Sequence, residues 1–127
     1  MALRLSFRLK SGEHAIPLAR VHAIVGYATL RGERDHYFRG WLCFHGEWVP
    51  VFDLNCLLCE DPSPETFGTR IILARCDDIA PVRLIGLLAA GVTDTVAAGD
   101  TSVALFNLDD YLPVLMNLIP DIPAVAE

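Results

Sequence analysis

The chain of 127 residues has little positive charge and no long apolar segment. Lys and Arg together number 10 against 16 Asp and Glu, which gives a net charge of −6. This charge disfavours nucleic acid and anionic membrane surfaces as partners, because both repel an acidic protein. No apolar run approaches the ~20 residues of a membrane-spanning helix, and the first ten residues lack the apolar core of a signal peptide. The sequence therefore predicts a cytoplasmic protein without membrane insertion.

The motifs of common enzyme and metal sites are missing as well. The sequence contains no nucleophile elbow, no phosphate-binding loop and no dinucleotide-binding glycine motif. Its four histidines are scattered, and none is spaced as a ligand pair. Asp53 has no second carboxylate or histidine at a recognised spacing, which favours a helix-capping role over a catalytic one. We therefore predict no enzyme activity, no catalytic residue and no cofactor.

The four cysteines do not form the pattern of a metal site. Cys56 and Cys59 are spaced as C-x-x-C, but Cys43 and Cys76 form no second pair. A structural zinc site normally uses two paired spacings. Leucines fill the space between Cys56 and Cys59, which favours packing over a thioredoxin-like redox role. The preferred interpretation is buried free thiols without a metal, and a zinc or redox site at Cys56 and Cys59 is the alternative.

Short apolar segments separated by turn residues make up most of the chain. The length predicts one domain over residues 1–127, and 53% hydrophobic with 20% charged residues is typical of a globular protein. Alternation of apolar and polar residues predicts a mainly β fold. Strands are expected at 3–10, 13–18, 20–27, 38–45, 48–53, 69–76, 82–89 and 92–96, with short helices near 54–59 and 108–118.

Residues 40 to 54 form the most informative stretch. They read Gly-Trp-Leu-Cys-Phe-His-Gly-Glu-Trp-Val-Pro-Val-Phe-Asp-Leu, with two apolar runs on either side of His45-Gly46-Glu47. Glycine between two strand patterns predicts a tight turn. Pro50 lacks an N–H group and is expected at a strand edge or start. Asp53 stands where it can cap the short helix that follows.

The two tryptophans of this stretch have two open interpretations. Trp41 and Trp48 lie on either side of the expected turn. Large aromatic residues there are typical of a packed core. If they point outward, they are candidate anchors for a protein partner, because such residues are enriched at interfaces.

The order of strand, tight turn, proline-containing strand and Asp-capped helix resembles the CheW-like family of bacterial chemotaxis coupling proteins. The family pattern runs glycine, a few apolar residues, Arg-Gly, three residues, Pro-Val, one residue, Asp-Leu. Here it stands as Gly40, Leu42 to Phe44, His45-Gly46, Pro50-Val51 and Asp53-Leu54. The resemblance extends to Phe7-Arg8-Leu9, His14 to Leu18, Val21-His22-Ala23-Ile24, Thr69 to Leu73, Leu84 to Leu88 and Gly91 to Val96.

The resemblance implies two small SH3-like β-barrel subdomains side by side. The first is expected at about 14–70, and the second at about 71–115 together with the N-terminal strand. Residues 103–115 look like the family's last strand and following helix, but the stretch before them is shorter than in the family. The second barrel is therefore expected to be shortened; in a second alignment, 111–123 is a shortened domain end. A strand left without its partner predicts a homodimer, because open strand edges seek partners.

The resemblance also implies a function, a non-enzymatic adaptor in a two-component signalling system. It would link the cytoplasmic tip of a chemoreceptor to a chemotaxis-type histidine kinase. The candidate contact residues are Val21, Ala23, Ile24, Trp41, His45 and Val51. The alternative is a self-associating structural module of the same family that makes no receptor contact.

Two positions depart from the family pattern. The arginine before the turn glycine is replaced by His45, and a commonly found glutamate is replaced by Ala23. An arginine is a permanent cation with forked donors, whereas an imidazole is mostly neutral near pH 7. Loss of both charged groups predicts an altered choice of partner.

Overall fold

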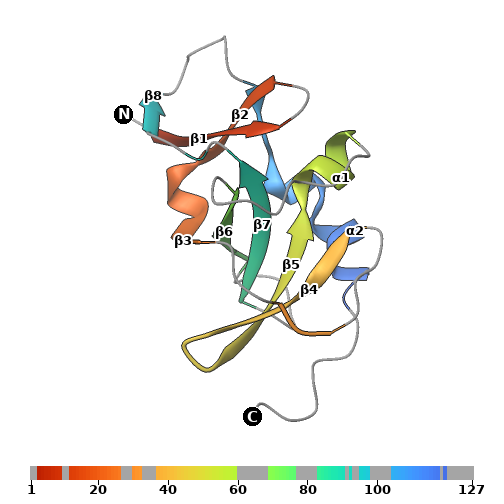
Figure 1. Cartoon of the computed structure of the whole chain (residues 1–127). Helices are drawn as coiled ribbons and strands as arrows, with labels where there is room; N and C mark the ends of the chain where they lie inside the picture. The colour runs from red at the N-terminus through yellow and green to blue at the C-terminus, as the bar shows by residue number, and fades with distance from the viewer. Residues whose placement is uncertain are drawn as a thin grey trace.

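The computed structural model describes residues 3–9, 12–26, 30–32, 37–59, 69–76, 83–90, 92, 95–97, 104–117 and 119. Within these ranges the protein is mainly β with a few short helices (Figure 1), which confirms the predicted fold class. The elements are β1 (Leu3–Leu9), β2 (Gly12–Pro17), η1 (Leu18–Arg20), β3 (Val21–Gly26), β4 (Phe38–Phe44), β5 (Glu47–Asp53), α1 (Leu54–Cys59), β6 (Thr69–Arg75), β7 (Leu84–Ala90), β8 (Thr95–Ala97), β9 (Ala104–Leu105), η2 (Leu108–Asp110) and α2 (Leu112–Asn117).

The strands fall into two groups that meet at β7. In the first group, β3 pairs with β6, β6 with β7, β7 with β5 in parallel, and β5 with β4. In the second group, β1 and β2 form a hairpin, β8 pairs with β1, and β9 pairs with β2 in parallel. The groups are joined where Arg8 of β1 faces Ala90 of β7. The described strands form SH3-like sheets without closing a barrel, and the predicted subdomain boundary near residue 70 stays a prediction.

Two apolar cores lie on opposite faces of β5, β6 and β7. Successive residues of a strand point to opposite faces, and here Ile71 and Leu73 of β6 enter one core while Ile72 and Ala74 enter the other. The sheet is therefore buried on both sides. The smaller core consists of Leu42, Val49, Val51, Ile71, Leu73, Leu84 and Leu88.

Gly86 permits close packing at the centre of the smaller core. A Cβ atom at this position would lie 2.9 Å from a methyl carbon of Ile71 and 2.9 Å from a methyl carbon of Val51. These are closer than real Cβ contacts, so a larger residue would push the neighbouring strands apart. The missing side chain lets β5 and β6 bring branched residues together over β7.

The larger core is completed by the C-terminal segment. Phe106, Leu108, Leu112 and Leu115 are all buried in it. The Phe106 N–H donates to the Ala15 carbonyl oxygen at 2.7 Å, just after the two paired residues of β9. A short strand followed by helical turns is the order that the first alignment of residues 103–115 predicted. The expected shortening of the second barrel stays a prediction, because residues 98–103 lie outside the described ranges.

Asp53 connects β5 to α1 in the way the sequence predicted. Its Oδ1 accepts a hydrogen bond from the Asn55 N–H at 3.0 Å, which confirms the capping role. The sequence did not indicate its second partner: Oδ2 lies 4.0 Å from Nε of Arg39. Asp53 is completely buried and the Arg39 side chain is 14% exposed. The carboxylate therefore fixes both the helix start and an inward-facing cation.

Candidate protein-interaction site

The hairpin of β4 and β5 ends in a two-residue turn formed by His45 and Gly46. Both have positive φ, at 49° and 81°. Two consecutive positive φ values are typical of the turn that matches the twist of antiparallel strands. The neighbouring residues Phe44 and Glu47 are paired across the strands. The predicted tight turn is confirmed, and it holds the exposed His45 side chain at the tip of a rigid hairpin.

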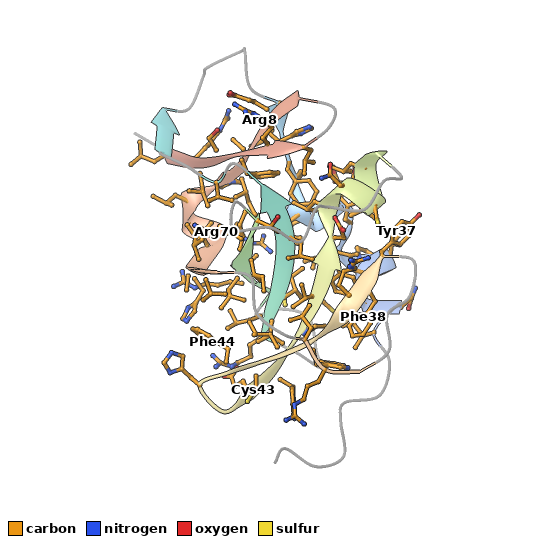
Figure 2. The ribbon with its side chains drawn as sticks, viewed as in Figure 1. Arg8, Tyr37, Phe38, Cys43, Phe44 and Arg70 are labelled. Atoms are coloured by element: carbon orange, nitrogen blue, oxygen red, sulfur yellow. The ribbon has the colours of Figure 1, made fainter. Side chains whose placement is uncertain are left out.

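Phe44 links this turn to β3. Figure 2 shows Phe44 and Cys43 at the end of β4, next to the turn. The Phe44 ring packs against the smaller core, and its centroid lies 4.3 Å from that of His45 and 6.0 Å from that of His22. The turn therefore contacts β3 at His22. We group the two elements as the β3–turn surface, which comprises Val21, His22, Ala23, Ile24, Phe44 and His45. Ile24 pairs with Ile72 of the larger core, so its side chain lies on the opposite face of the sheet from that of Ala23.

The strand β3 lies at an edge of the sheet. Among the described strands it pairs only with β6. Half-buried Val21 and Ala23 alternate with exposed His22 and Ile24. Ile24 is 42% exposed, so a large apolar side chain lies beside an open strand edge. A binding partner would therefore find an exposed apolar side chain and a row of backbone hydrogen-bonding groups side by side.

Trp41 and Val51 lie in the core and not on this surface. Trp41 is 2% exposed and Val51 is completely buried. Trp41 packs edge-on against Phe38 with ring centroids 5.6 Å apart. The reason is that β4 and β5 bury successive residues in the two cores on either face. The core interpretation of Trp41 is correct, and neither residue has a side chain available to a partner in this structure.

Pro50 also differs from its expected position, because it lies inside β5 opposite Trp41. The Trp41 N–H donates to the Arg31 carbonyl oxygen at 2.7 Å, and its own carbonyl accepts from the Arg31 N–H at 2.9 Å. Its backbone groups thus point away from β5. Antiparallel pairs alternate between bonded and non-bonded positions, so Pro50 occupies a place where its missing N–H costs the β4–β5 ladder nothing.

The cysteines and histidines show no metal centre within the described ranges. Cys56 and Cys76 are buried free thiols, and Cys43 is an exposed one. Over the same ranges, no group of three or more His, Cys, Asp or Glu residues could hold a metal ion. The side chain of Cys59 and the whole of His36 lie outside the description, so the C-x-x-C alternative stays untested. None of the described helices has the length and apolar character needed to cross a membrane.

One further polar cluster was not indicated by the sequence. Arg20, at the end of η1, forms an ion pair with Asp109 at 2.8 Å and donates to the Arg75 carbonyl oxygen at 2.8 and 3.2 Å. It ties the beginning of β3 to the end of β6 and to η2. No local pattern could have revealed a contact between residues 89 positions apart.

The comparisons with known proteins agree with this fold. The model of the CheW-like domain family matches residues 4–104, and the chain belongs to this family. Among solved structures it is similar to the scaffolding protein TtCheW from Thermoanaerobacter tengcongensis, with 19% sequence identity and a TM-score of 0.65. That likeness covers 80% of this chain and 64% of the other, so the chain spans less than two thirds of that protein's length. No curated protein sequence matches the chain.

Proposed function

We propose that this protein is a non-enzymatic, cytoplasmic adaptor that couples a chemoreceptor tip to a chemotaxis-type histidine kinase. Membership of the CheW-like family supports the general class. The observation that carries the proposal is the exposed Ile24 on the edge strand β3, whose neighbouring His22 contacts Phe44 beside the hairpin turn. An adaptor needs at least one apolar surface left open for a partner, and the β3–turn surface is of this kind.

The receptor contact would use the apolar side of a helical hairpin. Amphipathic helices bind by placing residues at i, i+3, i+4 and i+7 against an apolar surface. Ile24 supplies the exposed apolar group. Half-buried Val21 and Ala23 lie on the same strand and pack against the larger and the smaller core, respectively. The kinase would use another face, through a regulatory domain of similar fold.

A pair of matched variants tests the receptor contact. Ile24→Asp puts a charge on the proposed surface, and we expect it to weaken binding of a receptor-tip hairpin at least about tenfold, the loss typical of an interface anchor. Val114→Asp is the control, because Val114 is 50% exposed on α2 and lies outside the β3–turn surface. Isothermal titration measures both affinities. Equal affinities of the two variants and the unsubstituted protein would show that β3 is not a receptor contact.

A second test restores the two residues that depart from the family pattern, and it should strengthen receptor binding instead of weakening it. His45→Arg with Ala23→Glu restores both charged groups, and we expect it to tighten binding to a conventional receptor tip about tenfold, because charge-assisted hydrogen bonds are stronger than neutral ones. Ala23 packs against the smaller core, so the glutamate has to extend past the apolar edge to expose its carboxylate. A melting curve of the double variant controls for strain. An unchanged titration with normal melting would argue against a receptor role for these positions.

Self-association without receptor contact is the alternative function. The observation that favours it is the short β9, which has only β2 as a described neighbour. A self-associating module gives dimers in light scattering at micromolar concentration and retains no receptor hairpin in a pull-down. An adaptor, in contrast, retains the receptor hairpin in the same pull-down.

A further inference from the structure

A pocket of about 270 Å³ opens between β2, β9, α1 and η2 and shares no residue with the β3–turn surface. In Figure 1, α1 and β2 lie at the same end of the molecule. The volume is below that of pockets for drug-sized ligands, which begin at roughly 300 Å³, so the pocket suits one amino-acid side chain. Its lining consists of His14, Leu58, Ala104, Leu105, Phe106, Asn107, Asp110 and Tyr111.

One wall of the pocket is aromatic. The rings of Phe106 and Tyr111 are stacked, with centroids 5.2 Å apart and planes at 16°. Phe7 supports them from the core, at 6.5 Å from Phe106, and also stacks on His14 at 6.0 Å. Phe106 is buried and Tyr111 is half-buried. The wall is therefore held rigidly from behind, and aromatic faces attract cations.

The charge in the pocket is negative. Asp110 lines it, and among the described residues no cation lies within ion-pair distance of its carboxylate. The neighbouring Asp109 differs, because it is paired with Arg20 at 2.8 Å and does not line the pocket. Partial burial lowers the pKa of His14 below its usual 6.5. At neutral pH, His14 therefore adds no positive charge to balance Asp110.

An aromatic wall beside an unbalanced carboxylate suits a guanidinium group. Arginine is planar, stacks on aromatic rings and pairs with carboxylates, whereas lysine offers only a point charge. Leu105, 49% exposed, lies at the pocket on the edge strand β9. An extended segment beside an edge strand directs alternate side chains into a neighbouring pocket. We propose that this pocket takes an arginine side chain from an extended segment of a partner protein.

The partner is a different protein and not a second copy of this chain. The net charge of −6 makes two copies repel each other. A basic segment, in contrast, is attracted to the acidic protein before it reaches the pocket. This contact is independent of the proposed receptor surface, because the two sites use different elements.

The test compares two peptides of the same shape on the full chain. The probes are acetyl-Val-Arg-Val-amide and the peptide with citrulline in place of arginine. Citrulline is a neutral urea of nearly the same shape that lacks the charge and replaces one donor group by an oxygen. Chemical-shift titration of the ¹⁵N-labelled protein should show changes in the amides from Leu105 to Tyr111. We expect the citrulline peptide to bind about three- to fivefold more weakly, the effect of one partly exposed ion pair.

Two variants test whether the carboxylate of Asp110 is the group that attracts the arginine. Asp110→Asn should remove the difference between the peptides, and Asp109→Asn, which changes the net charge equally outside the pocket, should preserve it. Equal affinities of the two peptides for the unsubstituted protein would overturn the proposal, even if Asp110→Asn fails to fold. Shift changes confined to β3 and the hairpin turn would overturn it as well. A dimer in light scattering that Asp110→Asn dissociates would assign the pocket to a second copy instead.

Discussion

The two apolar cores are enclosed in different ways. The smaller core lies among β3 to β7, whose strands are six or seven residues long and paired over most of their length. The larger core uses β1 and β2, but β8 has three residues and β9 has two. Buried side chains from η2 and α2 complete it. Where strand pairing is short, side chains from helical turns take over the exclusion of water.

The same difference separates the two proposed binding sites. The β3–turn surface rests on a hairpin of two seven-residue strands whose pairing is interrupted once, between Phe38 and Gly40, whereas the pocket is formed largely by the segment from Ala104 to Tyr111. Sites on strands are held more accurately than sites on loops. We therefore expect the part of the molecule around the smaller core and the part around the larger core to respond differently to substitutions.

The largest effect should come from the larger core. Phe106→Ala removes a buried ring that contacts Phe7 and Tyr111, and we expect a loss of about 3–5 kcal/mol in the free energy of unfolding. Chemical denaturation followed by tryptophan fluorescence measures it. Phe106→Leu keeps most of the volume and should cost much less. A small loss for the alanine variant would mean that the C-terminal segment does not close this core.

The second largest loss of stability is expected from a substitution in the smaller core. Gly86→Ala places a Cβ atom 2.9 Å from both Val51 and Ile71, and we expect a cost of about 1–3 kcal/mol from overpacking. Gly26→Ala is the matched control, because no atom lies within 4 Å of the added Cβ. Thermal melting of the two variants gives the comparison. Equal melting temperatures would show that β5 and β6 can move apart freely.

Asp53 lies at the end of β5, just before α1. We expect Asp53→Ala to cost about 0.5–2 kcal/mol for the lost cap, toward the upper end because the ion pair with Arg39 is lost as well. Asp53→Asn keeps an oxygen for the Asn55 N–H and isolates the contribution of the charge. Partner binding per folded molecule should stay unchanged. Lost binding with unchanged unfolding would assign Asp53 to a binding site.

The smallest effect is a pH dependence of the free energy of unfolding that comes from His14 in β2, beside the larger core. The folded-state pKa of His14 lies below its usual 6.5 because burial disfavours the charged imidazole. The unfolded chain therefore takes up this proton first, and stability should fall as the pH drops below 6.5 and level off below the folded pKa. Denaturation curves between pH 5 and 8 test this against His14→Gln, with exposed His22→Gln as the control. An identical pH profile for His14→Gln and the unsubstituted protein would contradict it.

Local sequence patterns determined most of the fold. Alternation placed the strands β1 to β7 within one or two residues at each end, and the β8 strand less accurately. The turn at His45-Gly46 and the cap at Asp53 were predicted because both depend on neighbouring residues. The burial of Trp41 could not be decided, since alternation identifies two faces but not which face another strand covers. The Arg39 contact and the pocket depend on long-range pairing, for which the sequence has no local signal.

The hairpin turn has a consequence for how this protein can evolve. A residue at position 45 needs only to accept a positive φ, which several polar residues do, so its side chain can vary without changing the fold. The length of the turn cannot vary in the same way. One inserted residue would slip β5 against β4 and send every later side chain of the hairpin to the opposite core. The turn can thus accept a substitution at position 45 without a change of fold, but it cannot accept an inserted residue.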